Sequence, residues 1–168
     1  MFLRSARNAE FNVPGDYVEE AMAFVRRCWD EQEGGFCYSG GGGDGLGRGL
    51  TGAGIVSLAM AGQHQTAMAQ AAGNWLMAHP YRAFGDTIGY HDKFIYSTFY
   101  CSQAAAQLGG RCWQRFYPPL AAILVNAQSP NGSWPSDPNL ADFGDELTTA
   151  FAVLSLTPPY QLLPVYQR

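Results

Sequence analysis

The chain has 168 residues, of which 47% are hydrophobic and 14% charged, and its formal net charge is −4. A chain of this length can bury roughly two-thirds of the surface that it would expose when unfolded, so a folded globular domain is expected. The sequence has no run of Lys and Arg, which argues against a nucleic-acid-binding protein. No stretch reaches about 18 uninterrupted apolar residues, which argues against a transmembrane helix.

The first seven residues lack the apolar centre of a signal peptide, and the sequence assigns no cellular compartment. The four cysteines form no Cys-x-x-Cys pair, and the chain is long enough to fold without disulfide bonds. We therefore expect reduced, structural thiols at Cys28, Cys37, Cys101 and Cys112.

Residues 1–13 are expected to form the tail of a helix and a loop that runs into Pro14. Three amphipathic helices are then expected near 17–29, 67–78 and 117–127, because apolar residues recur there at helical spacing. The prolines 118 and 119 suit the first turn of the third helix, where a missing N–H costs nothing.

Each amphipathic helix is followed by a loop rich in Gly, Asp and aromatic residues, and then by a helix that is apolar all round. These second helices are expected near 50–61, 96–108 and 147–157. A helix without a polar face is buried on all sides. The alternation therefore predicts an all-α protein with an inner layer of apolar helices that the amphipathic helices shield.

The chain also repeats itself. Thr51 and Ser57 have matches 98 residues later in Thr149 and Ser155, and Thr98 lies 47 residues after Thr51. This period is typical of helix-pair repeats. The predicted organisation is one domain in which residues 1–13 precede three repeats, and a tail follows them. The repeats are 14–62, 63–109 and 110–157, and the tail is 158–168.

Gln128, Gly132 and Trp134 have the spacing Gln-x-x-x-Gly-x-Trp. This resembles the repeat motif that closes outer helices in squalene and oxidosqualene cyclases. The chain as a whole resembles the α/α toroid of terpenoid cyclases and protein prenyltransferases. The resemblance implies a ring of about six helix pairs, of which this chain supplies three. It therefore implies an N-terminally truncated chain, or a partial ring that is completed by self-association or by a missing N-terminal half.

The repeat register aligns Asp44, His91 and Asp142, each of which precedes an apolar helix. Equivalent positions in tandem repeats are expected to lie at the same end of the inner layer. His91 with the adjacent Asp92 is the best candidate for an acid, a base or a ligand, and Asp142 with Asp145 is the next. The alternatives are that His91 holds a loop and that the other carboxylates provide charge at a helix N-terminus.

Aromatic residues cluster in sequence around these positions and are expected to line a cavity beside Asp44. They are Tyr90, Tyr96, Phe99, Tyr100 and Phe151. His91 and Cys101 do not have the spacing of a zinc site, so no metal and no cofactor is expected.

We expect a terpenoid-cyclase-like or prenyltransferase-like repeat domain that binds an apolar or isoprenoid-like ligand, or a partner. The acid motif of the cyclases is missing, and the sequence leaves open whether the domain is an enzyme. The alternatives are an active terpenoid cyclase or prenyltransferase when the full ring is present, and a sugar-active α/α barrel whose carboxylates would come from Asp92, Asp142, Asp145 or Glu146.

Overall fold

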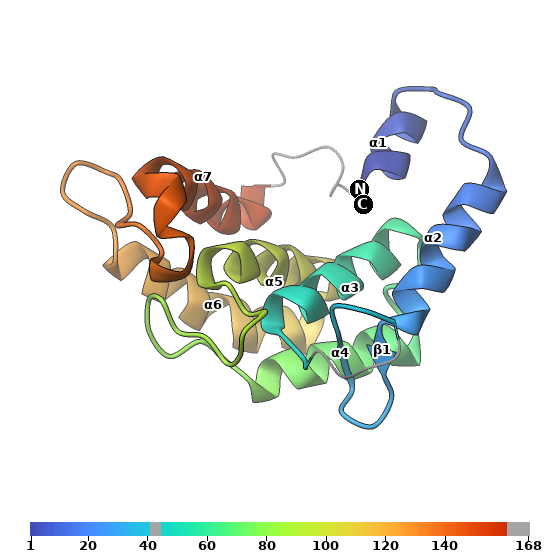
Figure 1. Cartoon of the computed structure of the whole chain (residues 1–168), viewed down its shortest axis with the longest axis horizontal. Helices are drawn as coiled ribbons and strands as arrows, with labels where there is room; N and C mark the ends of the chain where they lie inside the picture. Colours follow the sequence, from blue (N-terminus) through green and yellow to red (C-terminus); the bar gives the residue numbers. More distant parts are fainter. Residues whose placement is uncertain (41–44, 161–168) are drawn as a thin grey trace.

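The computed structural model of the chain describes residues 1–40 and 45–160. In these residues the fold is mostly helical, with seven α-helices and one pair of very short strands (Figure 1). The helices are α1 (Phe2–Asn8), α2 (Gly15–Arg27), α3 (Arg48–Met60), α4 (Ala67–Ala78), α5 (Phe94–Leu108), α6 (Gly110–Asn126) and α7 (Gly144–Leu156). The all-α class is confirmed, and each expected helix is present. No helix in the described residues is long and apolar enough to cross a bilayer.

The expected start of the third amphipathic helix was wrong. α6 begins at Gly110, a full two turns before residue 117, and Pro118 and Pro119 lie inside it. Each proline removes one N–H from the helical ladder. The carbonyl groups that lose their donors belong to Gln114 and Arg115, which are exposed, so water can replace the missing bonds.

Two short strands were not predicted from the sequence. They are β1 (Trp29–Asp30) and β2 (Gly35–Phe36), which pair antiparallel. The Asp30 carboxylate closes their turn by accepting hydrogen bonds from two backbone N–H groups, at 2.9 and 3.0 Å. Gly34 then supplies a φ of +77°, which residues with a side chain rarely adopt. The strands hold the buried Phe36 ring against Trp29, with 5.1 Å between ring centroids.

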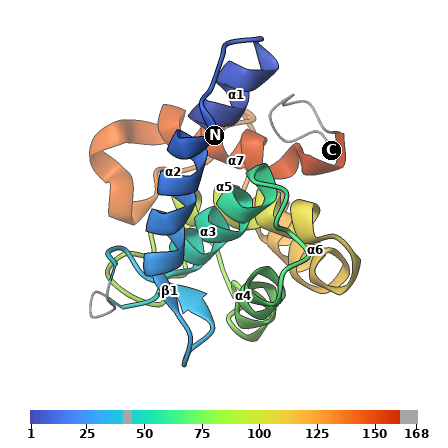
Figure 2. The same cartoon turned by 90° about the vertical axis from the view of Figure 1, so that its right-hand side faces the viewer.

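The three apolar helices lie side by side in the order α3, α5, α7, and the amphipathic helices cover one side of this row (Figures 1 and 2). α4 packs against both α3 and α5, and α6 packs against both α5 and α7. α2 packs on α3 at the end of the row. The core lies between the two sets of helices, where Ile55, Leu76, Ile95 and Leu124 have no exposed surface.

Glycines let α3 and α5 approach closely. A Cβ atom on Gly52 would lie 2.8 Å from the backbone of Tyr100 and Cys101, closer than real contacts allow. A Cβ atom on Gly54 would lie 2.5 Å from the Phe36 ring. Gly52 therefore allows contact between the backbones of α3 and α5, and Gly54 makes room for the Phe36 ring.

Equivalent hydrogen bonds occur 98 residues apart. The Thr51 hydroxyl accepts from the backbone N–H of Phe36 at 3.1 Å, and the Thr149 hydroxyl accepts from that of Trp134 at 3.0 Å. The first and third repeats therefore join loop and helix in the same way.

Trp134 is buried, and its indole N–H donates to the Leu124 carbonyl of α6 at 2.6 Å. The Gln128 side chain donates to the Gly132 carbonyl at 2.9 Å. The expected repeat motif thus ties the end of α6 to the loop that leads to α7.

The secondary structure at the two ends of the chain differs from the expectation. Within residues 1–13, α1 forms a helix of seven residues with no buried side chain. At the other end, a 3₁₀ turn at Pro158–Tyr160 packs on α5 and α7. The rest of the expected tail, residues 161–168, lies outside the described residues.

Candidate functional site

The N-terminal ends of α3 and α5 meet around a buried guanidinium. Arg48, the first residue of α3, has no exposed surface. Its Nε donates to the Asp92 carboxylate at 2.7 Å, and its terminal nitrogens donate to the carbonyl of Asp86 at 2.6 Å and to its carboxylate at 3.1 Å. The guanidinium carbon also lies 3.9 Å from the centre of the Tyr81 ring. Burial opposes its charge, but Tyr81, Asp92 and Asp86 outweigh that effect and raise the pKa of Arg48.

Asp92, one of the candidate catalytic residues, is part of this network. It is 1% exposed and also accepts hydrogen bonds from the Ser97 hydroxyl at 2.6 Å and the Ile88 N–H at 3.1 Å. Both carboxylate oxygens are therefore engaged. The geometry makes Asp92 a residue that fastens the loop before α5 to α3.

Sequence reasoning missed Arg48, although a signal was available. A charged residue in a segment that is otherwise apolar and buried must have a partner. Asp86 and Asp92 are the acidic residues of the loop between α4 and α5.

A second buried carboxylate was also missed. Asp137 has no exposed surface and accepts a hydrogen bond from the N–H of Ile95, in the first turn of α5, at 2.9 Å. Its own N–H donates at 3.0 Å to the hydroxyl of Thr148, in the first turn of α7. Asp137 therefore joins the N-terminal ends of α5 and α7, as Asp92 joins those of α3 and α5.

His91 lies next to Asp92 but does not share its network. Its ring is half-buried and stacks on Tyr38, with 5.0 Å between centroids and 13° between planes. Tyr90 lies edge-on to the same ring at 5.1 Å, and Lys93 Nζ lies 4.9 Å from the centre of the Tyr90 ring. These contacts make His91 part of an aromatic surface.

The other candidate carboxylates are not gathered around His91. Asp142 lies in the 3₁₀ turn Pro138–Phe143, and Asp145 lies in the first turn of α7. Both side chains are exposed, and neither forms a hydrogen bond or ion pair with His91 or Asp92 within the described residues. Asp44, the third equivalent position, lies outside the described residues.

Four of the expected cavity-lining residues do come together, from α5 and α7. Tyr96 lies 4.9 Å from Tyr100 and 6.1 Å from Phe151 between ring centroids. Phe99 lies 5.0 Å from Tyr100 and 5.5 Å from Phe151. Phe99 is 7% exposed and Tyr96 is 39% exposed, so the cluster runs from the core to the surface. Burial, followed by the hydrogen bond to Tyr100, raises the pKa of Tyr96.

Within the described residues, no group of three or more His, Cys, Asp or Glu side chains is placed to hold a metal ion. Cys101 and Cys112 are buried, and burial raises the pKa of both thiols, that of Cys112 to about 11. The four rings of Tyr96, Phe99, Tyr100 and Phe151, named the four-ring cluster below, are therefore the candidate binding surface.

Comparison of the chain with models of protein families, with curated proteins and with solved structures gave no significant match.

Proposed function

We propose that the chain is part of an α/α toroid, similar to those of terpenoid cyclases and protein prenyltransferases, and that it binds an apolar, isoprenoid-like ligand on the four-ring cluster. The row of apolar helices with amphipathic helices along one side supports the toroid. The repeated loop-to-helix hydrogen bonds support it further, because they divide the chain into equivalent helix pairs.

The four-ring cluster is the observation that supports ligand binding. Its members present ring faces and edges from two neighbouring helices, and Tyr96 remains partly exposed above the buried Phe99. Aromatic rings give a large apolar contact area, and their faces attract cations and polarisable groups. A branched, unsaturated hydrocarbon matches both properties.

The contacts of Asp92 and His91, the best of the candidate residues, favour binding over catalysis. The Asp92 carboxylate is committed to Arg48 and Ser97, and the His91 ring is held between tyrosines. A group that donates a proton to a substrate must be able to reach it. Asp142 and Asp145 are exposed, but within the described residues neither pairs with His91 or Asp92, so the four-ring cluster rather than an acid–base pair supports contact with a ligand.

The test is a titration of the chain with farnesol, followed by saturation-transfer NMR or calorimetry. The double variant Tyr96→Leu with Phe151→Leu is expected to lose at least tenfold in affinity, because two of the four rings are gone. Tyr17→Leu is the matched control, since Tyr17 is an exposed tyrosine on α2. An equal loss of affinity in the double variant and in Tyr17→Leu, or no binding of farnesol to the unchanged chain, would refute the proposal.

Catalysis is tested separately. Incubation with squalene or with farnesyl diphosphate, followed by mass spectrometry of the products, is expected to return the substrate unchanged. A cyclised or transferred product would overturn the binding-only assignment and would support the cyclase or prenyltransferase alternative.

A further inference from the structure

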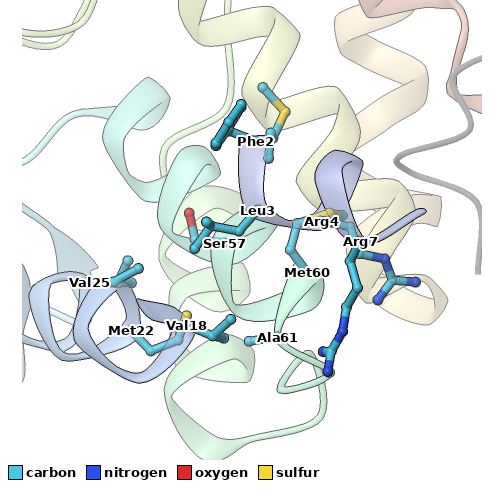
Figure 3. Close-up of a pocket in the computed structure, with 13 residues that line it drawn as sticks. Phe2, Leu3, Arg4, Arg7, Val18, Met22, Val25, Ser57, Met60 and Ala61 are labelled. Atoms are coloured by element: carbon cyan, nitrogen blue, oxygen red, sulfur yellow. The ribbon is translucent and has the colours of Figure 1, made fainter. Parts of the chain in front are cut away.

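A cavity of about 450 Å³ lies at the other end of the molecule, between α1, α2 and the C-terminal end of α3 (Figure 3). Its volume is within the range of small-molecule sites, roughly 300–1,000 Å³. The α2 wall is apolar and is formed by Val18, Met22 and Val25, which share one helix face. Met60, the last residue of α3, and Ala61, which follows it, continue this wall.

The residues that the structure describes cover this wall only in part. α2 is amphipathic, yet Met22 is its one buried residue, while Val18 and Val25 are half-buried. α1 closes the remaining side with Phe2 and Leu3 but buries none of its own residues. A ligand in this space would bury apolar surface that the fold leaves partly exposed, which favours binding.

The charged residues of the lining all have the same sign. Arg4 and Arg7 of α1 are three residues apart, which places them on one face of the helix, and both line the cavity. The lining has no acidic residue. Neither guanidinium forms an ion pair with a side chain that the structure describes, so both remain available to an anion.

An apolar wall with two arginines at its side matches one class of ligand. The geometry points to a second binding site, for a single-chain amphiphile whose hydrocarbon chain lies against α2 and α3 and whose anionic head binds Arg4 and Arg7. Guanidinium groups bind carboxylate and phosphate oxygens with good geometry, so the head is one of these two. The site shares no residue with the four-ring cluster and stands independently of the function proposed for it.

Calorimetric titration with dodecanoate and dodecyl phosphate, each below its micellar concentration, and with dodecanol below its solubility limit, tests the site. We expect both anions to bind more tightly than dodecanol. Arg4→Gln with Arg7→Gln should weaken the anions at least tenfold and dodecanol less than twofold. The matched control is Arg27→Gln with Arg82→Gln, which removes the same charge from two exposed arginines outside the cavity. It should change every affinity less than twofold.

The apolar part is tested by Ala21→Phe, which places a ring in the cavity while keeping both arginines. It should weaken all three probes, whereas Tyr96→Leu with Phe151→Leu should weaken none. Lengthening the carboxylate from ten to twelve carbons should raise affinity by up to about fourfold for each methylene.

The relative affinities of the two anions identify the head group, and either order supports the site. Equal weakening by the two arginine pairs, or binding of dodecanol as tight as that of the anions, would overturn it. So would a dimer in light-scattering measurements that Ala21→Phe dissociates, because the cavity would then be an interface between two copies. Failure of this site would leave farnesol binding at the four-ring cluster unchanged, so the two proposals can fail separately.

Discussion

At the scale of single residues, buried polar side chains define this molecule more than its candidate catalytic residues do. Arg48 has no exposed surface, and its hydrogen bonds to Asp86 and Asp92 connect α3 to the loop that precedes α5. Asp137 does the same for α5 and α7 through Ile95. Taking a charge out of water is expensive unless it is fully paired. These contacts therefore fix one arrangement of the helix ends.

Replacing Arg48 with Met should be strongly destabilising. It leaves Asp92 buried without its cation, and breaking a buried pair in this way costs about 3–5 kcal/mol. The free energy of unfolding, measured by urea denaturation, should fall by that amount. Arg82→Met, at an exposed arginine in the loop that carries Asp86 and Asp92, should change it by less than about 0.5 kcal/mol. If the double variant Arg48→Met with Asp92→Leu is no more stable than Arg48→Met alone, the uncompensated charge is not the cause.

Raised pKa values in the core predict a loss of stability in alkali. Burial raises the pKa of Cys112 to about 11, and burial followed by the nearby Tyr160 raises that of Tyr117 to about 12. In the unfolded chain these groups lose their protons near pH 9 and pH 10, their ordinary values. The folded state therefore holds more protons than the unfolded state in this range, and stability falls as pH rises.

Thermal melting should show this effect. The melting temperature should be nearly constant between about pH 7 and pH 8 and fall between about pH 9 and pH 12, from the ordinary pKa of the thiol to the raised pKa of Tyr117. Cys112→Ala should make the fall less steep, because one of the contributing groups is gone. A melting temperature that rises with pH in this window would show that the thiol and phenol are not held protonated by the fold.

At the scale of helices, the sequence predicted the elements well and their ends less well. Hydrophobic periodicity located the amphipathic helices, because the pattern reflects which face is buried, and stretches that are apolar all round located the inner helices. It misplaced the start of α6, because Pro118 and Pro119 were read as a first turn, whereas exposed carbonyls tolerate them inside the helix. It missed β1 and β2, because two-residue strands contain too few residues for an alternating pattern.

The same limits apply to the candidate site. The four-ring cluster could be predicted from the sequence. Tyr96, Phe99 and Tyr100 lie on the apolar helix α5, and Phe151 lies on the neighbouring apolar helix α7. The burial of Arg48 in an apolar segment indicates that it has an acidic partner, but the sequence does not show that the partner is Asp92, because that contact joins residues 44 positions apart whose directions depend on tertiary packing. Sequence spacing located the candidates without showing which side chains were already bonded.

The close approach of α3 and α5 leads to a prediction about Gly52. An added Cβ atom would meet backbone atoms of α5, which cannot rotate away, so the helices must separate. Gly52→Ala should therefore destabilise by about 1–3 kcal/mol despite the better helix propensity of alanine. The control is Gly15→Ala in α2, where a Cβ atom meets nothing within 4 Å. It should be neutral or stabilising by up to about 1 kcal/mol in the same denaturation experiment. A neutral Gly52→Ala would contradict the close packing.

At the scale of the whole molecule, the helices differ in how many of their residues are buried. α5 lies at the centre of the row, contacts both α3 and α7, and has 11 of its 15 residues buried. α1 lies at the opposite extreme, with seven residues and none buried. A helix shorter than about 12–15 residues is marginal in water without tertiary contacts. The repeats therefore form a connected core to which α1 is weakly attached.

This gradient should be visible in amide hydrogen exchange. The amides of α5 should exchange only through global unfolding, whereas those of α1 should exchange through local opening that costs far less free energy. Gly52→Ala should then lower the free energy of exchange of the α5 amides by the same amount as it lowers the free energy of unfolding. The exchange of the α1 amides should be unchanged, because α1 opens without disturbing the contact between α3 and α5. Dodecanoate should do the opposite and protect α1 while the protection of α5 rises no more than global stabilisation requires. Equal protection of α1 and α5 in the unliganded chain would show that α1 belongs to the same cooperative unit as the core.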